Sequence, residues 1–553
     1  MRATQPTTFD AIVIGAGFSG LYMLYKLREQ GLTVKLLEAA DGVGGTWHWN
    51  RYPGARCDVE SIMYSYSFSP ELEQEWNWTE KYPAQPEILA YLNHVADRFD
   101  LRRDIQLNTR VVRAQYDQGS AHWQLETQAG ERFDVQFCIM ATGALSAPKD
   151  PQFEGLSSFK GKWYQTSRWP REPVEFKGKQ VAVIGTGSTG TQAIPVIAAQ
   201  AAHLYVFQRT PHYSVPAGNR PLDPEVLRST KARYRELRAN VRVSASGMHE
   251  HPTSGRSALE ASPEEREQAY GEAWNAGNAP ALVGMYGDLL TNLEANETVA
   301  SFVRRKIREI VKNPEVAQSL TPSGYPFATK RLCLGTNYYD TYNRNNVTLV
   351  DVRQTPIQEI VPEGIRTSAA TYPLDILVFA VGFDALTGAL LNIDIRGRNQ
   401  QTLHLAWTDG PKTYLGLGIP GFPNLFPIVG PGSPSVLSNM VSAIEQHVEW
   451  IADCIAYLRK NGFDSIEATP QAQDAWVEHV REVANLTLYP HANSWYLGAN
   501  VPGKPRVFMP YIGGLGVYRQ KCDEVARNGY EGFVLGRTQQ SSEPTPRAAA
   551  LSS

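Results

Sequence analysis

Two stretches of the chain share one pattern of hydrophobic and polar positions. In each, a short apolar run leads to a glycine-rich turn, and apolar residues at helical spacing follow. The first stretch has its apolar run at residues 11–14 and its helix pattern ends at Gly31; the second has its run at residues 180–184 and a helix pattern over 191–199. Short apolar runs bounded by turn residues are typical of buried strands. Both stretches therefore predict a strand, a tight turn and a helix.

A second apolar run follows each predicted helix, at residues 33–38 and at 203–208. Strand, helix and strand in this order make a β-α-β unit, which in proteins forms a parallel sheet. The two units are too far apart along the chain for a short structural repeat and indicate separate domains. We therefore predict an α/β fold with two Rossmann-like dinucleotide-binding domains.

The segment between the second unit and the later strands has a different pattern. Residues 223–324 are rich in charges at helical spacing, which predicts a helical insertion in the second nucleotide domain. Within it we expect helices over 225–242 and 296–312, and a mobile surface loop over 247–263. Further on, the pattern predicts strands at 347–352, 357–361 and 375–381, a long helix over 435–460, and a disordered tail over 539–553.

Composition and charge exclude several classes of protein. The chain has 553 residues, 42% of them hydrophobic, so two or three domains with sizeable cores are expected. Its net charge of −3 does not favour nucleic acid or an anionic membrane as a partner. Five scattered cysteines without metal-ligand spacing predict neither a metal site nor a disulfide framework. No apolar run reaches membrane-spanning length, so we expect a cytoplasmic protein. We also expect a monomer.

The first glycine turn carries the pattern of a dinucleotide site. Gly15, Gly17 and Gly20 give a tight turn, a close approach to pyrophosphate, and close packing of helix on strand. The helix that follows presents its unpaired N–H groups to the phosphates. Glu38, at the end of the next strand, is placed to accept hydrogen bonds from ribose hydroxyls.

The second turn, at Gly185, Gly187 and Gly190, differs at the end of the following strand. The residues there are Gln208, Arg209 and Thr210, with no acid. A carboxylate would repel a 2′-phosphate, whereas a guanidinium binds phosphate through a fixed fork of donors. The second nucleotide is therefore predicted to be NADPH.

Two dinucleotide sites on one chain indicate electron transfer from a nicotinamide to a flavin. Apolar strands that break at a glycine, at 138–143 and 378–384, are expected where the chain crosses between the two domains. A disulfide reductase has the same two nucleotide sites but needs a redox cysteine pair near the flavin. Cys57 has no close partner in the sequence, so this class is excluded.

Longer motifs make the comparison specific. The segment GGTWHWNRYPGARCD at 44–58 resembles the flavin-side fingerprint of Baeyer-Villiger monooxygenases, and FKGKWYQTSRWP at 159–170 resembles their linker fingerprint FxGxxxHxxxWP. The resemblance covers about residues 8 to 537 and is greatest to the phenylacetone and steroid monooxygenase branch. Segments that carry it include YPGARCDVES, SFSPELEQEWNW, GTGSTGTQ, VFQRTPH, GFDALTGAL, GPGSPSVLSNM and SWYLGANVPGKPRVFMP.

The resemblance implies an enzyme that uses FAD, NADPH and dioxygen to convert ketones to esters or lactones, and thioethers to sulfoxides. It also implies how the chain is divided. We expect an FAD domain in two parts, 1–145 and 384–538, an NADP domain in two parts, 146–222 with the linker and 325–383, a helical insertion at 223–324, and a tail at 539–553.

In the ketone reaction, negative charge develops first on the oxidant and then on the former carbonyl oxygen, so the site needs a fixed cation. The segment Thr329-Lys330-Arg331-Leu332 matches the family segment that holds a catalytic arginine. The resemblance therefore implies that Arg331 is catalytic, that Asp58 pairs with it and orients it, and that Lys330 binds the 2′-phosphate beside Arg209 and Thr210.

The remaining site residues are also implied by the resemblance. Around FAD we expect Gly15, Gly17, Ser19, Gly20, Glu38, Thr46, Trp47, Trp49, Asp58, Tyr64, Val111 and Met440. Around NADP we expect Arg56, Cys57, Thr186, Gly187, Ser188, Thr189, Gly190, Arg209, Thr210, Lys330, Arg331 and Trp495, the last on a loop that closes over the nucleotide. Ser435, Val436 and Leu437 are expected to line the substrate pocket.

One position departs from the family pattern. Where the linker fingerprint has histidine, this chain has Gln165, which keeps a donor and an acceptor but carries no proton charge near neutral pH. The change is either tolerated or lowers the coupling of NADPH oxidation to product. Two alternatives therefore stay open: a flavin monooxygenase or NADPH oxidase acting mainly on sulfur or nitrogen, and a nucleotide-binding regulator without turnover.

Overall fold

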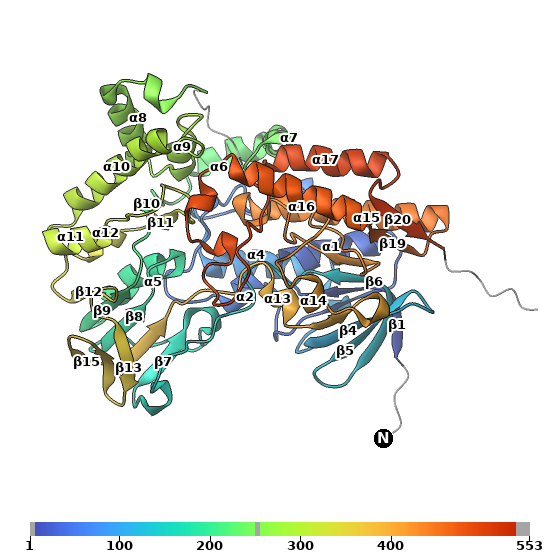
Figure 1. The fold of residues 1–553 in the computed structure, drawn as a ribbon, viewed down its shortest axis with the longest axis horizontal. Coiled ribbons are helices and arrows are strands. Elements are labelled where there is room, and N and C mark those ends of the chain that lie inside the picture. Colours follow the sequence, from blue (N-terminus) through green and yellow to red (C-terminus); the bar gives the residue numbers. More distant parts are fainter. Residues whose placement is uncertain (1–5, 249–254, 538–553) are drawn as a thin grey trace, which may run out of the picture.

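The two predicted β-α-β units form the centres of the two largest sheets (Figure 1). The computed structural model describes residues 6–248 and 255–537. In the first sheet, β1 (Thr7–Ile14) is parallel to β2 (Val34–Leu37) on one side and to β6 (Arg132–Met140) on the other. The sheet continues with β3 (Ile105–Gln106), β4 (Val111–Asp117), β5 (His122–Thr127), β17 (Asp394–Arg396) and β18 (Leu425–Pro427).

The second sheet is parallel throughout, with the strand order β12-β9-β8-β16-β7. Its strands are β7 (Lys162–Gln165), β8 (Gln180–Ile184), β9 (His203–Gln208), β12 (Val347–Asp351) and β16 (Ile376–Phe379). β8, β9 and β16 are almost completely buried, as expected for strands covered on both faces. The strand predicted at 357–361 is β13 (Ile357–Val361), which instead joins a separate antiparallel sheet with β14 (Gly364–Thr367) and β15 (Thr371–Pro373).

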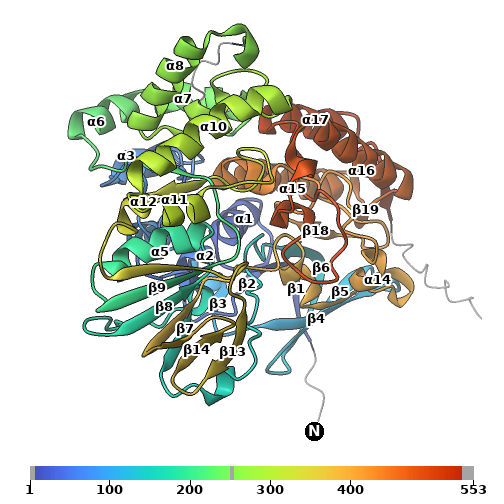
Figure 2. The ribbon, with the colours of Figure 1, turned by 60° about the vertical axis from the view of Figure 1, so that its left-hand side comes forward.

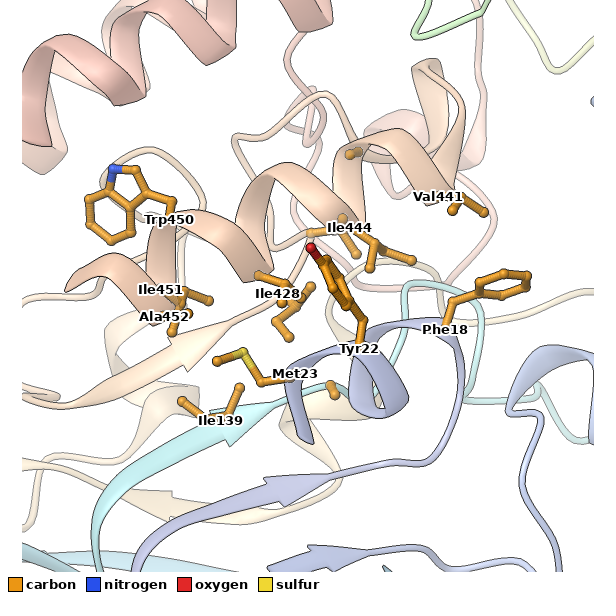
Figure 3. Packing of buried hydrophobic residues seen from close by; sticks show 14 of the residues in the cluster. Phe18, Tyr22, Met23, Ile139, Ile428, Val441, Ile444, Trp450, Ile451 and Ala452 are labelled. Carbon is orange, nitrogen blue, oxygen red and sulfur yellow. The ribbon is translucent and has the colours of Figure 1, made fainter. Parts of the chain in front are cut away.

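The helix of the first unit is covered by the longest helix of the chain. Phe18, Tyr22 and Met23 of α1 (Phe18–Glu29) pack against the apolar face of α15 (Met440–Asn461), as Figure 3 shows. Ile139 of β6 and Ile451 of α15 belong to the same cluster of buried residues. Burying apolar area yields about 25 cal/mol per Å², so this contact stabilises the first nucleotide turn.

The start of α15 corrects one prediction. The helix expected over 435–460 begins at Met440, because the side chain of Asn439 accepts a hydrogen bond from the backbone of Val441 and caps the helix there. Residues Ser435–Leu437 form a short 3₁₀ turn instead. Ser435 has φ +44°, a left-handed backbone conformation that no helix continues through.

The described elements from 224 to 320 are helices, gathered on one side of the molecule opposite β13 and β14 (Figure 2). They are α6 (Pro224–Ala232), α7 (Tyr234–Val243), α8 (Pro263–Asn275), α9 (Ala279–Gly284), α10 (Leu293–Ile310) and α11 (Pro314–Leu320). The single helix expected over 225–242 is two helices, since Arg233 leaves the helical backbone with ψ near 8°. The division of the chain into domains stays a proposal.

Short elements complete the fold. The other helices are α2 (Thr46–Trp49), α3 (Pro70–Glu75), α4 (Gln85–Arg98), α5 (Ser188–Ala198), α12 (Tyr338–Thr341), α13 (Gly388–Leu391), α14 (Leu403–Ala406), α16 (Pro470–Asn485) and α17 (Leu515–Arg527). The other strands pair as β10 (Ser214–Pro216) with β11 (Cys333–Gly335) and β19 (Ser465–Ala468) with β20 (Phe533–Gly536).

Two predicted segments lie wholly or partly outside the described residues: the loop at 247–263, of which 249–254 are not described, and the tail at 539–553. Within 6–248 and 255–537, no helix combines the length and apolar character needed to cross a membrane. The same residues hold no group of three His, Cys, Asp or Glu side chains arranged for a metal ion. All five cysteines are buried free thiols.

The turn between β8 and α5 gives a stability prediction. Gly185 has φ +109°, and a Cβ there would lie 2.4 Å from the carbonyl oxygen of Ala380. Gly178 has φ +73° but nothing within 4 Å of an added Cβ. Gly178→Ala should therefore cost only the conformational penalty of about 1–2 kcal/mol, whereas Gly185→Ala adds a backbone clash and should cost clearly more. Thermal unfolding of both variants measures the difference, and equal losses would contradict the clash.

Candidate active site

The two glycine turns have the same geometry. Gly15 and Gly185 both have φ +109°, and an added Cβ would lie 2.5 Å and 2.4 Å from the carbonyl oxygens of Ala141 and Ala380. The helices that follow have Gly17 and Gly187 at their N-caps, with no side-chain cap hydrogen bond. Their first N–H groups are therefore left for a ligand, and nothing lies within 4 Å of a Cβ added at Gly187.

The residues opposite these turns differ in charge. The amide of Gly15 donates to the Leu37 carbonyl and that of Gly185 donates to the Phe207 carbonyl, so Glu38 and Gln208 occupy equivalent positions. Glu38 is 5% exposed and accepts hydrogen bonds from the Ala16 and Ala40 amides, at 2.6 Å and 2.8 Å. Burial raises its pKa. At the second turn the neutral Gln208 leaves no carboxylate to repel a 2′-phosphate.

Arg331 and Asp58 lie far apart in the sequence and form an ion pair in the structure. Nε and Nη2 of Arg331 donate to Oδ2 of Asp58 at 2.9 Å and 2.5 Å, and Nη1 donates to the carbonyl oxygen of Val436 at 2.8 Å. The side chains are 33% and 27% exposed. The Asp58 carboxylate raises the pKa of Arg331 above its already high ordinary value. The predicted pairing is thus present, and it keeps the guanidinium charged.

Tyr496 is a further partner of this guanidinium that the sequence did not indicate. Its phenol is hydrogen-bonded to Arg331. The side chain is only 2% exposed, and burial raises the pKa of the phenol. Because an arginine has no acceptor, the tyrosine oxygen accepts this bond and its O–H stays available to donate.

The fingerprint segment that carries Asp58 docks on α5 through Gln192. The Tyr52 hydroxyl donates to Oε1 of Gln192 at 2.8 Å, and Nε2 of Gln192 donates to the Arg56 carbonyl at 3.1 Å. A Cβ at Gly54 would lie 2.5 Å from the Gln192 carbonyl oxygen. The two nucleotide-binding units therefore meet at this segment. Gln192 lies in the motif GTGSTGTQ, but no local pattern indicates its partners.

The aromatic residues expected at the flavin are placed differently from one another. Trp47 donates from Nε1 to the hydroxyl of Tyr64 at 3.1 Å, and their rings lie edge to face at 5.9 Å. Trp49 is 40% exposed and contacts His48 instead. The structure therefore brings Trp47 and Tyr64 together but not Trp49.

The other residues expected around the flavin lie in four different elements. Ser19 is buried in α1, Thr46 is exposed at the start of α2, and Met440 is the first residue of α15. Val111 begins β4 and packs in the same buried cluster as Ile14 and Leu37.

Basic groups gather beyond the second turn. Burial, together with the charges of Lys330 and Arg209, lowers the pKa of His212 to about 4, so its imidazole is neutral near pH 7. Lys330 Nζ lies 4.4 Å from the ring centroid of Tyr325. Thr210 offers its carbonyl to the hydroxyl of Thr186 at 3.3 Å. The sequence indicated Arg209, Thr210 and Lys330 but not His212.

The remaining residues expected at NADP are distributed around the same turn. Ser188 contacts Cys333 at 3.6 Å between Oγ and Sγ, and Thr189 is hydrogen-bonded to Tyr52. Arg56 is already paired, because Nη1 donates to Glu80 at 2.8 Å. Cys57 is 6% exposed, and burial raises the pKa of its thiol. The guanidinium of Arg56 is thus less available to a ligand than we expected.

Trp495 belongs to a segment held by two lysines. Its ring lies 4.3 Å from that of Tyr496. Lys149 Nζ donates to the Asn500 carbonyl at 2.6 Å, and Lys504 Nζ donates to Asp384 at 2.5 Å. These contacts connect the Trp495 segment to the chain just after residues 138–143 and to residues 378–384, the two stretches expected to cross between the nucleotide units.

Gln165 reaches the same region. Its Nε2 donates to the carbonyl oxygen of Lys149 at 2.7 Å, and the side chain is 4% exposed. The glutamine at the departure from the family pattern thus makes a buried structural hydrogen bond.

The turn that accepts from Arg331 lies at an apolar cluster. Val436, Leu437 and Met440 pack there with Tyr489 and Tyr496. The hydroxyl of Ser435 is buried without a hydrogen-bond partner. The guanidinium and the phenol are therefore the polar groups beside a mainly apolar surface, an arrangement typical of small-molecule sites.

Comparison with known proteins identifies the family. A model of the flavin-binding monooxygenase-like family matches residues 10–216. A Baeyer-Villiger monooxygenase of Pseudooceanicola batsensis is 45% identical, over 97% of this chain and 98% of that protein. A phenazine N-monooxygenase of Lysobacter antibioticus is 42% identical, over 97% and 98% respectively.

Among solved structures, an oxidised steroid monooxygenase bound to NADP is 53% identical. It superimposes with a TM-score of 0.92 over 96% of this chain and 100% of that chain. With such identity over nearly the full length of these proteins, and with two nucleotide turns joined by an arginine–aspartate pair, the chain belongs to the Baeyer-Villiger monooxygenases of the flavin-binding monooxygenase-like family.

Proposed function

We propose that this protein is an FAD- and NADPH-dependent Baeyer-Villiger monooxygenase that inserts one oxygen atom of dioxygen into ketones to give esters or lactones. The observation that carries the proposal is the ion pair of Arg331 with Asp58, which joins the second nucleotide unit to the flavin-side fingerprint. Family membership supports the reaction class, and the ion pair supplies the charge that the reaction needs.

The residues fit the two cofactors. The first N–H groups of α1 have no side-chain cap and are open to a pyrophosphate. The two carboxylate oxygens of Glu38 accept from backbone amides and keep further lone pairs for ribose hydroxyls. At the second turn, Gly187 is open, and Arg209 and Lys330 would bring positive charge to a 2′-phosphate beside the neutral imidazole of His212. A bound FAD would supply the redox chemistry that joins oxidation of NADPH to reduction of dioxygen, with one oxygen atom going to the ketone and the other to water.

Arg331 would stabilise the negative charge that develops during oxygen transfer. Three of its five N–H groups are committed to Asp58 and Val436, which fix the plane of the guanidinium. One of the remaining two is hydrogen-bonded to the Tyr496 oxygen, so the last N–H group and the O–H of Tyr496 can face the oxidant and the former carbonyl oxygen. A preorganised cation costs no reorganisation at the moment of reaction, which makes such groups effective.

The substrate side is apolar. The cluster around Val436, Leu437 and Tyr489 is suited to the hydrocarbon part of a ketone, while Ser435 offers an unpaired hydroxyl. We propose Ser435, Val436 and Leu437 as the residues that set substrate size. A monomeric state and a cytoplasmic location are part of the proposal and rest on the sequence.

A second function is favoured by one relative. The phenazine N-monooxygenase shares 42% identity with this chain, which supports nitrogen oxidation as an alternative; sulfur oxidation remains part of the proposal from the sequence. These reactions do not build charge on a carbonyl oxygen, so they depend less on Arg331. A regulator without turnover is disfavoured by the intact ion pair.

Arg331→Ala should abolish ester formation, with a loss of about 10²- to 10³-fold in rate, because it removes the fixed cation. Reduction of the flavin by NADPH should continue. Arg331→Lys keeps the charge but loses the planar fork. Its rate of ester formation should lie between the rates of the wild-type protein and of Arg331→Ala. Product analysis with an aryl ketone, a cyclic ketone and a thioether measures ester, sulfoxide and hydrogen peroxide together. A near-normal ester yield from Arg331→Ala would refute the assignment.

Arg209→Ala should raise the KM for NADPH about 10-fold or more and leave that for NADH nearly unchanged, because the guanidinium binds only the 2′-phosphate. Arg308→Ala, which removes an exposed arginine from α10, is the matched control and should change neither constant. Steady-state kinetics with both nucleotides provide the measurement. Equal losses for NADPH and NADH would count against a 2′-phosphate contact.

Gln165→His should increase the ester formed per NADPH oxidised. An imidazole can keep the hydrogen bond to the Lys149 carbonyl and can in addition carry a proton, which the amide cannot. Gln165→Asn has the same amide on a shorter side chain that no longer reaches Lys149, and should lower the ratio. If Gln165→His leaves the ratio unchanged, the glutamine is simply tolerated.

A further inference from the structure

The carbonyl oxygen of Met63 is a meeting point of three parts of the chain. Nδ2 of Asn439 donates to it at 2.8 Å, and Nη1 of Arg238 donates to it at 3.4 Å. Met63 precedes Tyr64, which carries the hydrogen bond from Trp47. Asn439 is completely buried. A buried amide with a specific partner fixes the distance between the segments it joins.

Asn439 makes its contacts with three separate groups. Its Oδ1 accepts from the Val441 amide at 3.1 Å and caps α15, while its own backbone amide donates to the Ser246 carbonyl at 2.8 Å. Capping uses only the acceptor of the side chain. The donor, which reaches Met63, serves no purpose in the helix cap.

The turn that orients Arg331 ends at this residue. Val436, whose carbonyl accepts from Arg331, stands three positions before Asn439. Within the turn, the Leu437 amide donates to Pro434 at 3.0 Å and the Ser438 amide donates to Ser435 at 3.1 Å. The side chains of Val436 and Leu437 also pack in an apolar cluster, but the hydrogen bonds that tie the end of the turn to other segments are those of Asn439 to Met63 and Ser246.

Arg238 holds Met63 from the other side. Its Nη2 donates to Ser65 at 2.7 Å and its Nε donates to Glu73 at 2.8 Å. The side chains of Arg238 and Glu73 are 9% and 8% exposed. The hydroxyl of Ser442 in α15 also donates to the carbonyl oxygen of Gly247, in the segment after α7, at 3.0 Å. Met63 is therefore a fixed anchor for Asn439.

We propose that Asn439 is a positioning residue, which sets the Arg331-binding turn against the Met63–Tyr64 segment through its hydrogen bond to the Met63 carbonyl. The inference rests on the proposed function of Arg331 and adds a specific residue to it. Loss of the bond lets the turn shift, and Val436 then no longer holds the guanidinium in one place. Displacements of 1 Å in such supports are enough to lower a catalytic rate about 10²-fold.

The test separates this bond from the helix cap. Asn439→Asp and Asn439→Ser both keep an oxygen that accepts from Val441, but neither can donate to Met63: the carboxylate has no donor, and the serine is too short. Asn292 caps α10 in the same way from an exposed position, so Asn292→Asp is the matched control.

All variants are purified with FAD and compared with wild type in four measurements: flavin content, the rate of flavin reduction by NADPH without oxygen, ester formed per NADPH oxidised, and hydrogen exchange of the amides of residues 437 and 438. We expect both Asn439 variants to bind FAD and be reduced within about 2-fold of the wild-type rate. Ester per NADPH should fall about 10-fold, and the two amides should exchange about 10-fold faster. Asn292→Asp should match wild type throughout.

Three results would overturn the proposal. They are wild-type coupling in both Asn439 variants, loss in Asn439→Asp alone, which would assign the effect to the new charge, and loss of FAD together with coupling, which would show a general structural role. Failure of the proposed function is distinguishable, because the wild-type protein itself would then form no ester.

Discussion

The fixed charge of Arg331 is the constraint on which the rest of the site depends. The guanidinium is about one-third exposed, so it is not stabilised by burial but by the Asp58 carboxylate, which also raises its pKa. An isolated arginine on a loop would sample many rotamers, whereas two hydrogen bonds to one carboxylate oxygen and a third to Val436 select a single orientation. Asp58 therefore sets the charge of the guanidinium, and Asp58 and Val436 together set its orientation.

The two partners come from different parts of the chain, and this explains why the nucleotide units must meet closely. Asp58 lies in a segment that docks on α5 through Gln192, while Val436 lies in the turn that precedes α15. α15 in turn packs on α1, the helix that starts at the first nucleotide turn. Each helix that follows a glycine turn thus also supports one partner of Arg331.

The sequence predicted the elements whose signals are local. Periodicity and turn chemistry predict both glycine turns and the strands at 180–184 and 203–208, and the structure has them. The start of α15 at Met440 was missed because Asn439 and Ser435 both suit a helix start, and only the left-handed backbone of Ser435 decides between them. The pairing of Arg331 with Asp58 came from the family resemblance, since no periodicity indicates it.

What could not be predicted depends on contacts between residues far apart in the sequence. Gln192, His212 and Tyr496 are ordinary polar residues in their local segments, and their roles arise only when other segments surround them. The unpaired hydroxyl of Ser435 is likewise a property of its buried surroundings. The functional assignments of these residues therefore stand as predictions, while their positions are structural facts.

The most direct measurement of the central claim is a crystal structure of the protein with FAD and NADP⁺ bound. The account predicts that Arg331, still paired with Asp58, faces the isoalloxazine ring at the position where oxygen and ketone react. A guanidinium far from that ring in the presence and in the absence of NADP⁺, with no rearrangement that could bring it closer, would contradict it.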